Sequence, residues 1–522
     1  MRNSKTSIYR VALTVALGGF LMGFDASVIS GVVGFIETEF DLSKLQLGWA
    51  VSCLTLTSTL AMMLSGPLSD KIGRKKVLQY AAVLFFVSAI YSALAPNFVH
   101  LVIARMIGGL GVGAALIIAP MYIAEISPAK IRGRLVSFNQ LNIVLGISVA
   151  FFTNYLILQW GKSDASWAQA LNFSQYTWRW MLGLEALPAI LYFGFLFFVP
   201  DSPRWLIMHG MKERALVIME RMTSKQVAEE EMNNILNSIE QDKNKAKVHI
   251  RELFKPALRF VLTIGVVIAI LQQITGINSV FFYAPMIFEQ TGIGRDASFI
   301  QAIIIGLTNL VFTVVAILVV DKLGRKPLLI FGLAGIFISM FLLGSVFKGA
   351  EYKLTTESIN ELSELEGYQS LMQIEGKTYH SDLDFKSAIS EVLGEKTIIK
   401  HQGTIIAKAI SINSWLVLIG IIGFVASFAV SLGPVMWILF SELFPNMLRG
   451  IAISFAGFIN SGISFTVQLL LPWELANIGN AGTFFIYGGF AVLGFFFVIR
   501  YLPETKGKSL EELEKFLVRS KK

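Results

Sequence analysis

Two short stretches decide the fold: GPLSDKIGRKK at residues 66–76 and VVDKLGRKP at residues 319–327. Both contain the pattern Asp-x-x-Gly-Arg, and each comes at the end of a long apolar run. A second pair, EISPAKIRGR at 125–134 and SELFPNMLRG at 441–450, places an arginine seven residues after a glutamate in each copy. We therefore predict that one structural unit occurs twice, in the same order along the chain.

The composition indicates a membrane protein. Of 522 residues, 54% are hydrophobic and only 15% are charged, whereas a soluble domain usually carries about 25% charged residues. Apolar runs of about 20 residues recur, each long enough to cross a bilayer as a helix. The predicted spans are 8–33, 46–69, 77–95, 99–119, 136–158, 178–199, 260–288, 297–320, 327–347, 410–440, 450–472 and 481–502. We predict an all-α protein embedded in lipid.

The spacing of the two copies locates an insertion. Asp321 follows Asp70 by 251 positions. Glu442 follows Glu125 by 317, so the second copy is longer by 66. A polar segment at about 348–407 accounts for this length. The predicted domains are a six-helix bundle at 1–200, a helical linker at 201–258, and a second six-helix bundle at 259–522 that contains the insertion.

Basic loops set the predicted orientation. Lys71, Arg132 and Lys322 lie in three different loops that fall on one side of the bilayer, and an excess of lysine and arginine marks the cytoplasmic side. We expect both termini and the linker to be cytoplasmic and the insertion to lie outside. The net charge of +8 is explained by these loops, so no nucleic-acid partner is predicted.

The repeated motifs predict a charged network at the cytoplasmic helix ends. Asp70 ends the second span, Gly73 permits a tight turn, and Arg74 then reaches a carboxylate on a neighbouring helix. The ion pairs of such a network would form in one conformation of the protein and break in the other. The alternative is a set of exposed ion pairs, each of which contributes little to stability. The predicted members are Asp70, Arg74, Glu125, Arg132, Arg134, Arg204, Asp321, Arg325, Glu442 and Arg449.

The chain resembles the sugar porters of the major facilitator superfamily. The stretches that carry the resemblance are GRKK at 73–76, PMYIAEISPAKIRGR at 120–134, PDSPRWL at 200–206, QQITGIN at 272–278, GPVMWILFSELFP at 433–445 and LPETKG at 502–507. The resemblance implies the major facilitator fold, with twelve transmembrane helices in two pseudo-symmetric bundles, and alternating access to a monosaccharide. Within this family, the chain is most similar in its motifs to bacterial proton-coupled xylose, arabinose and galactose symporters, and this resemblance implies a location in a bacterial inner membrane. No enzyme activity, cofactor or metal is predicted, and one chain suffices.

Asp25 lies inside the first span, in GGFLMGFDASVISG. A charged side chain at the bilayer centre costs about 3 kcal/mol on insertion scales, so it requires a partner or a water-filled cavity. The resemblance implies that Asp25 pairs with Arg105 of the fourth span and carries the coupled proton, with Glu185 of the sixth span as a second candidate. The alternatives are a static ion pair and, for Arg105, a side chain that extends to the interface.

A monosaccharide site should combine hydrogen-bonding side chains with an aromatic face. The candidates, which match the pocket of the resembling family, are Gln140, Gln272, Gln273, Asn278, Tyr283, Asn309, Trp437 and Asn460. Each amide alone could instead join helices, as polar groups in membranes often do. Met22 and Ser461 stand where relatives often carry aromatic residues, so the particular sugar stays open.

The predicted function is proton–monosaccharide symport. Two alternatives remain at this stage: a facilitative sugar uniporter on the same fold, and a sugar sensor that does not transport.

Overall fold

The computed structural model describes residues 2–128, 131–223, 225–244, 250–363, 365, 367–445 and 448–507. Of the motif residues quoted above, Ala129, Lys130, Asn446 and Met447 lie outside these ranges. Within the described part of the chain, twelve segments are helical, long and apolar enough to cross a membrane. The predicted all-α membrane fold is confirmed.

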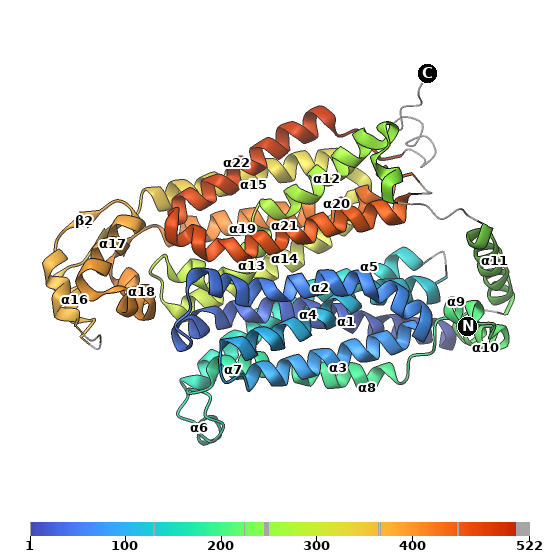
Figure 1. Cartoon of the computed structure of the whole chain (residues 1–522), viewed down its shortest axis with the longest axis horizontal. Coiled ribbons are helices and arrows are strands. Elements are labelled where there is room, and N and C mark those ends of the chain that lie inside the picture. Colours follow the sequence, from blue (N-terminus) through green and yellow to red (C-terminus); the bar gives the residue numbers. More distant parts are fainter. Residues whose placement is uncertain are drawn as a thin grey trace. The chain divides into compact units, whose positions relative to one another are not determined.

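The first half contributes six spans. They are α1 (Arg2–Glu39), α2 (Lys44–Ile72), α3 (Arg74–Ala93), α4 (Phe98–Ile126), α5 (Arg132–Gly161) and a broken sixth span made of α7 (Thr177–Gly183) and α8 (Ala186–Leu196). The short α6 (Ser166–Ala170) precedes α7. These elements run from blue to green in Figure 1. The connecting segment contains α9 (Pro203–Met208), α10 (Lys212–Met222), α11 (Lys225–Asn244), η1 (Ile250–Phe254) and η2 (Pro256–Leu258).

The second half contributes six more spans. Its first and fourth are broken, into α12 (Arg259–Ile274) with α13 (Ile277–Glu289) and into α19 (Ser414–Val430) with α20 (Leu432–Leu443). The others are α14 (Arg295–Leu323), α15 (Arg325–Lys348), α21 (Arg449–Asn477) and α22 (Gly479–Tyr501). The break after α12 falls at Gly276, whose φ of 93° is a left-handed conformation that favours glycine.

The insertion between α15 and α19 folds around a core of its own. Its elements are β1 (Glu351–Lys353), α16 (Thr356–Asn360), η3 (Tyr368–Ile374), β2 (Thr378–Tyr379), α17 (Asp382–Leu393), α18 (Glu395–Ala409) and β3 (Ile410–Ser411). The strands form a small antiparallel sheet in the order β2-β1-β3, with Tyr352 of β1 opposite Tyr379 and Ile410. The sequence did not predict this sheet, because strands of two or three residues carry too short an alternation to recognise.

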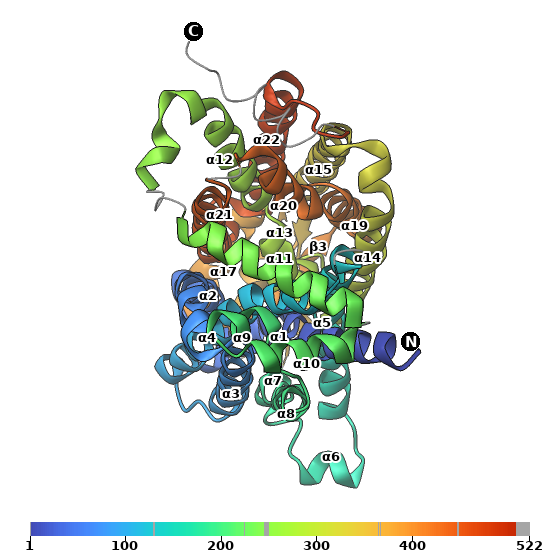
Figure 2. The same ribbon diagram turned by 90° about the vertical axis from the view of Figure 1, so that its right-hand side faces the viewer.

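The chain divides into two compact units. The first comprises Met1–Ser27, Cys53–Ala150 and Arg179–His249, and the second comprises Val28–Ser52, Phe151–Trp178 and Ile250–Lys522. Helices α1, α2 and α5 therefore contribute one end to each unit. Within the first unit α3 packs along α4, and within the second α15 packs along α22, as Figure 1 and Figure 2 both show.

The ends of the spans are named below by what they carry. In each unit, the motif end of the spans is the end that carries its own Asp-x-x-Gly-Arg motif, and in the second unit the insertion end is the opposite one. At the motif end, Gly73 between α2 and α3 has a φ of 98°, and Gly324 between α14 and α15 has a φ of 94°. A side chain at either position would be strained, which explains the glycine in both motifs.

Candidate functional site

Arg74 is the centre of a charged cluster at the motif end of the first unit. It starts α3 and is only 4% exposed. Its guanidinium donates to the Ser69 carbonyl at 3.1 Å, to Asp70 at 2.8 Å and to Glu125 on α4 at 2.9–3.1 Å. Because the planar guanidinium presents several donors in fixed directions, one side chain joins the ends of α2, α3 and α4.

Arg325 makes the same contacts in the second unit. It lies 3.2 Å from Asp321 and 2.8 Å from Glu442 on α20, and it donates to the Val320 carbonyl at 3.3 Å. Each of these contacts has a counterpart among the contacts of Arg74. In both units the arginine also binds the carbonyl of the residue that precedes the aspartate. The sequence repeat is thus matched by equivalent side-chain contacts in the two units.

Arg132 and Arg449 hold the turn that follows each glutamate. Arg132 donates to the Ser127 carbonyl at 3.2–3.3 Å, and Arg449 donates to the Phe444 carbonyl at 3.3 Å. Both carbonyls lie two residues after the glutamate of the cluster. These arginines therefore shape the chain beside the ion pairs and do not pair with the glutamates.

A third repeated element was not predicted. The Ser202 hydroxyl donates to Glu125, and the Thr505 hydroxyl donates to Glu442 at 2.6 Å. Glu504 also accepts from the backbone N–H groups of Arg325 and Lys326 at 3.0–3.1 Å, at the start of α15. The signal was present in the sequence: Pro-Asp-Ser at 200–202 and Pro-Glu-Thr at 503–505 are parallel tripeptides.

The remaining two predicted members are Arg134 and Arg204. Arg134 is exposed on α5, two residues after Arg132. Arg204 is half-buried on α9, two residues after Ser202. The matched core of each cluster is therefore formed by the arginine, its two carboxylates and one hydroxyl.

Asp25 and Arg105 meet in the interior of the first unit. Asp25 is 0% exposed on α1, and Arg105 is 1% exposed on α4. Arg105 Nη1 donates to Asp25 Oδ1 and also to the Asp25 backbone carbonyl, at 3.1 Å. Arg105 is thus an interior residue, and its side chain does not extend to the end of α4. Asp25 Oδ2 and Arg105 Nε have no hydrogen-bond partner within the described residues.

Glu185 adds a second carboxyl group to this interior. It lies in the break between α7 and α8 and is 1% exposed. It lies close enough to Asp25 and Arg105 to interact electrostatically with both, and its Oε1 has no hydrogen-bond partner among the described residues. Two carboxyl groups and one guanidinium therefore share one solvent-excluded region. We call Asp25, Arg105 and Glu185 the buried trio.

Gly108 of α4 allows this close approach. A Cβ at this position would lie 2.7 Å from Asp25 Oδ2 and 2.5 Å from the Ser88 hydroxyl on α3. Both distances are shorter than real Cβ contacts, so with any side chain here the Asp25 carboxylate and the Ser88 hydroxyl would have to shift. The absence of a side chain at Gly108 therefore leaves the Asp25 carboxylate in its present place.

A cluster of amide side chains lies inside the second unit. Asn460 on α21 donates to Gln272 Oε1 at 2.6 Å, and Gln273 donates to Asn460 Oδ1 at 3.1 Å. Asn278, at the start of α13, donates to Gln273 Oε1 at 2.9 Å and to Ser464 at 2.6 Å. The structure thus brings four of the predicted sugar-site residues into one hydrogen-bonded network, with Ser464 as a member that was not predicted.

Tyr283 extends this network along α21. Its hydroxyl donates to the Gln468 carbonyl at 2.9 Å, and the Gln468 side chain donates to Ser464 at 2.7 Å. Asn460, Ser464 and Gln468 are spaced by four residues and so share one helix face. That spacing was the signal in the sequence for the two unpredicted members.

The other sugar-site candidates are placed differently. Trp437 on α20 is 47% exposed and lies 3.9 Å from the position of a Cβ on Gly457. Asn309 is buried on α14. Gln140 is exposed on α5 and belongs to the first unit, so the described contacts do not join it to the amide cluster.

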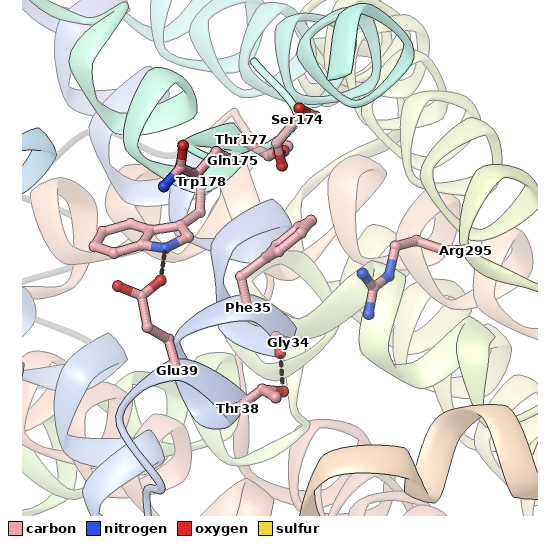
Figure 3. A pocket seen from close by; sticks show the side chains of 9 residues that line it. All are labelled: Gly34, Phe35, Thr38, Glu39, Ser174, Gln175, Thr177, Trp178 and Arg295. Carbon is pink, nitrogen blue, oxygen red and sulfur yellow. Dashed lines mark hydrogen bonds between the residues drawn. The ribbon is translucent and has the colours of Figure 1, made fainter. Parts of the chain in front are cut away.

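At the insertion end, the second unit contains a cavity of about 330 Å³ lined by α1, the start of α7 and Arg295. Figure 3 shows the Trp178 indole N–H directed at Glu39. The Arg295 guanidinium lies 4.7 Å from the centre of the Phe35 ring, a cation–π arrangement. The adjacent tip of α5 pairs through Lys162 with Asp296 of α14. The end of α1 thus contacts the second half of the chain through the Phe35 ring, and the end of α5 does so through an ion pair.

Twelve spans in two matched sets, with paired charge clusters and an interior ion pair, define a membrane transporter built from parallel repeats. The model of the family "Sugar (and other) transporter" matches residues 11–362 and 394–517. The chain belongs to this family, within the major facilitator superfamily.

Relatives of known activity cover almost the whole chain. The chain is 36% identical to an arabinose-proton symporter of Bacillus subtilis, over 98% of this chain and 95% of that protein. It is also 36% identical to a D-xylose-proton symporter of Escherichia coli, over 97% and 95%. Among solved structures, the inward-open xylose transporter XylE of E. coli superposes with a TM-score of 0.73 at 33% identity, covering 98% of this chain and 100% of that one.

Proposed function

We propose that the protein is a proton-coupled monosaccharide symporter that works by alternating access. The observation that carries the proposal is the buried trio. It contains one positive and two potentially negative side chains in a region closed to solvent, so its net charge is zero when one carboxyl group holds a proton. An uncompensated buried charge is costly, and such a group gains or loses its proton when its partner moves.

The proposed cycle uses this proton. Asp25 takes a proton from outside and loosens from Arg105, with Glu185 as the second group on which the proton can reside. Sugar binds, the outer parts of α1 and α13 close, and the inner side opens. Sugar and proton then leave to the cytoplasm. A facilitative uniporter has no need for the buried trio, which is why symport is favoured.

The proposed substrate is a pentose or hexose. The amide cluster of α12, α13 and α21 offers several donors and acceptors in fixed positions, and the half-exposed Trp437 offers an aromatic face. The relatives named for arabinose and xylose support this class. The proposed sugar ligands are Gln140, Gln272, Gln273, Asn278, Tyr283, Asn309, Trp437 and Asn460.

The two motif-end clusters are proposed to form the cytoplasmic gate. The proposed orientation places both termini and these clusters in the cytoplasm and the insertion outside, in a bacterial inner membrane, with one chain sufficient for transport. The proposed domain limits remain 1–200, 201–258 and 259–522. Matched contacts of Arg74 and Arg325 support a gate in which each half closes with the same bonds.

The test is accumulation in proteoliposomes. Purified protein is reconstituted, an acid-outside pH gradient is imposed, and uptake of labelled D-xylose and L-arabinose is followed. A symporter raises internal sugar above the external concentration and loses this effect with a protonophore. A uniporter only equilibrates the sugar, and a sensor binds it without flux, so either result would overturn the proposal.

A further inference from the structure

The break in the seventh span is packed against one aromatic ring. Tyr487 of α22 is 2% exposed. Its ring carbons lie 2.4 and 2.6 Å from the position that a Cβ on Gly276 would occupy. Gly276 is the left-handed residue that separates α12 from α13. The ring therefore packs directly against the glycine that determines the direction of α13 relative to α12.

The hydroxyl of the same tyrosine links α13 to a carboxylate. Tyr487 donates to Glu474 of α21 at 2.8 Å. Because its single proton is used there, Tyr487 accepts from the hydroxyl of Ser279, in the first turn of α13, at 3.4 Å. The Ser279 contact is long, whereas the bond to the carboxylate is short and charge-assisted. Glu474 therefore fixes the tyrosine, and the tyrosine fixes the first turn of α13.

Helix α13 is also held by α21. Asn278 donates to Ser464, and Tyr283 donates to the Gln468 carbonyl. Asn278 is adjacent to Ser279, so the position of one determines the position of the other. A shift of the first turn of α13 therefore disturbs the hydrogen bond from the Asn278 amide to Gln273, which is 2.9 Å long.

We propose that Glu474, acting through Tyr487, is a positioning residue for sugar binding: it holds the first turn of α13 so that Asn278 stays in the amide cluster. The buried trio of the first unit plays no part in this role. This inference rests on the proposed function in one respect: the Glu474–Tyr487 hydrogen bond is expected to determine the affinity for sugar.

The test compares variants in the same proteoliposome uptake assay, with rates expressed per reconstituted transporter. Tyr487→Phe keeps the ring on Gly276 and removes the hydroxyl, and Glu474→Met removes the acceptor at similar volume. Each is expected to raise the KM for sugar by about three- to tenfold, as for the loss of one buried hydrogen bond, and to leave the maximal rate within about twofold. The double variant should be no worse than either single one, because both remove the same bond.

Two controls separate positioning from general damage. Glu474→Gln keeps an acceptor for the tyrosine and should restore a KM within about twofold of the parent, since a neutral hydrogen bond still forms. Tyr501→Phe alters an exposed tyrosine of the same helix and should change nothing. An unchanged KM in Tyr487→Phe, or equal KM values for Glu474→Gln and Glu474→Met, would overturn the inference. A parent protein that neither binds nor moves sugar would instead overturn the proposed function, and the inference with it.

Discussion

Arg105 holds Asp25 by two hydrogen bonds from the same nitrogen, one to the carboxylate and one to the backbone carbonyl of the aspartate. Both residues are buried in the first unit. The backbone bond does not depend on the charge of the side chain, so Arg105 keeps one contact with α1 when the carboxylate is neutralised. Proton binding at Asp25 would therefore weaken the link between α1 and α4 without breaking it.

Asp25→Asn is expected to separate sugar movement from proton movement. The amide keeps the size of the carboxylate and permanently removes its charge, so the step that requires proton release can no longer occur. Exchange of sugar across the membrane, measured as counterflow, should persist, whereas accumulation driven by a pH gradient should be lost. Accumulation by the variant equal to that of the parent would contradict the proposed role.

Gly108→Ala is expected to disturb the buried trio sterically. The added methyl group would meet Asp25 Oδ2 and the Ser88 hydroxyl at 2.5–2.7 Å, and overpacking of this kind costs about 1–3 kcal/mol. We expect a clear loss of pH-driven accumulation in proteoliposomes. The matched control is Gly194→Ala on α8, where no atom lies within 4 Å of the added Cβ and uptake should be unchanged. Normal accumulation in Gly108→Ala would show that the close approach is dispensable.

Arg74→Lys and Arg325→Lys are expected to slow transport to a similar extent. Lysine carries its donors on one nitrogen and has no planar fork, so it cannot reproduce contacts that the guanidinium makes from several nitrogens in fixed directions. Loss of such bonds, worth about 1–3 kcal/mol, should lower the maximal uptake rate about fivefold or more. Arg134→Lys, at an exposed position, serves as the control and should match the parent. A strong effect in one half and none in the other would argue against a gate made of two equivalent clusters.

Lys386→Met is expected to loosen the insertion from the last two spans. Lys386 pairs with Asp382 at 2.9 Å, and Asp382 also accepts from Asn480 of α22 at 3.3–3.4 Å. Burial lowers the pKa of Lys386, against the opposing effect of Asp382. Removing the lysine leaves a buried carboxylate unpaired, which costs about 3–5 kcal/mol.

The measurement for this change is thermal unfolding in detergent, read together with limited proteolysis of the segment 349–413. Lys408→Met is the control, because Lys408 pairs with Glu361 where both side chains are nearly half exposed, and such pairs contribute about 0–1 kcal/mol. Equal stability of the two variants would mean that the Asp382–Lys386 pair does not hold the insertion.

The repeat was readable from sequence because its residues lie at fixed short spacings. Asp70 with Arg74, and Asp321 with Arg325, are four residues apart, and the glycine between them marks the turn. The hydroxyl partners were missed because Ser202 and Thr505 lie far along the chain from Glu125 and Glu442. Only folding brings these pairs together, and the tripeptides at 200–202 and 503–505 had to be read as a third repeat.

The amide cluster was predicted in part for a similar reason. Gln272, Gln273, Asn278 and Asn460 stand out as polar residues in apolar spans, whereas a serine such as Ser464 carries no comparable signal, because small hydroxyl residues are common in membrane helices. Asp25 stood out by its charge, and Arg105 was assigned to it by resemblance. The Glu474–Tyr487 bond had no local signal, because it joins two helices whose register only the fold sets.

The central claim, that sugar and proton move together through the buried trio, is tested most directly by proton uptake on addition of sugar. Parent and Asp25→Asn proteoliposomes are placed in weakly buffered medium with no imposed gradient, and external pH is followed as D-xylose or L-arabinose is added. The account predicts alkalinisation with the parent and none with Asp25→Asn, although the variant still exchanges labelled sugar in counterflow. Sugar entry into parent vesicles with no change in external pH would contradict it.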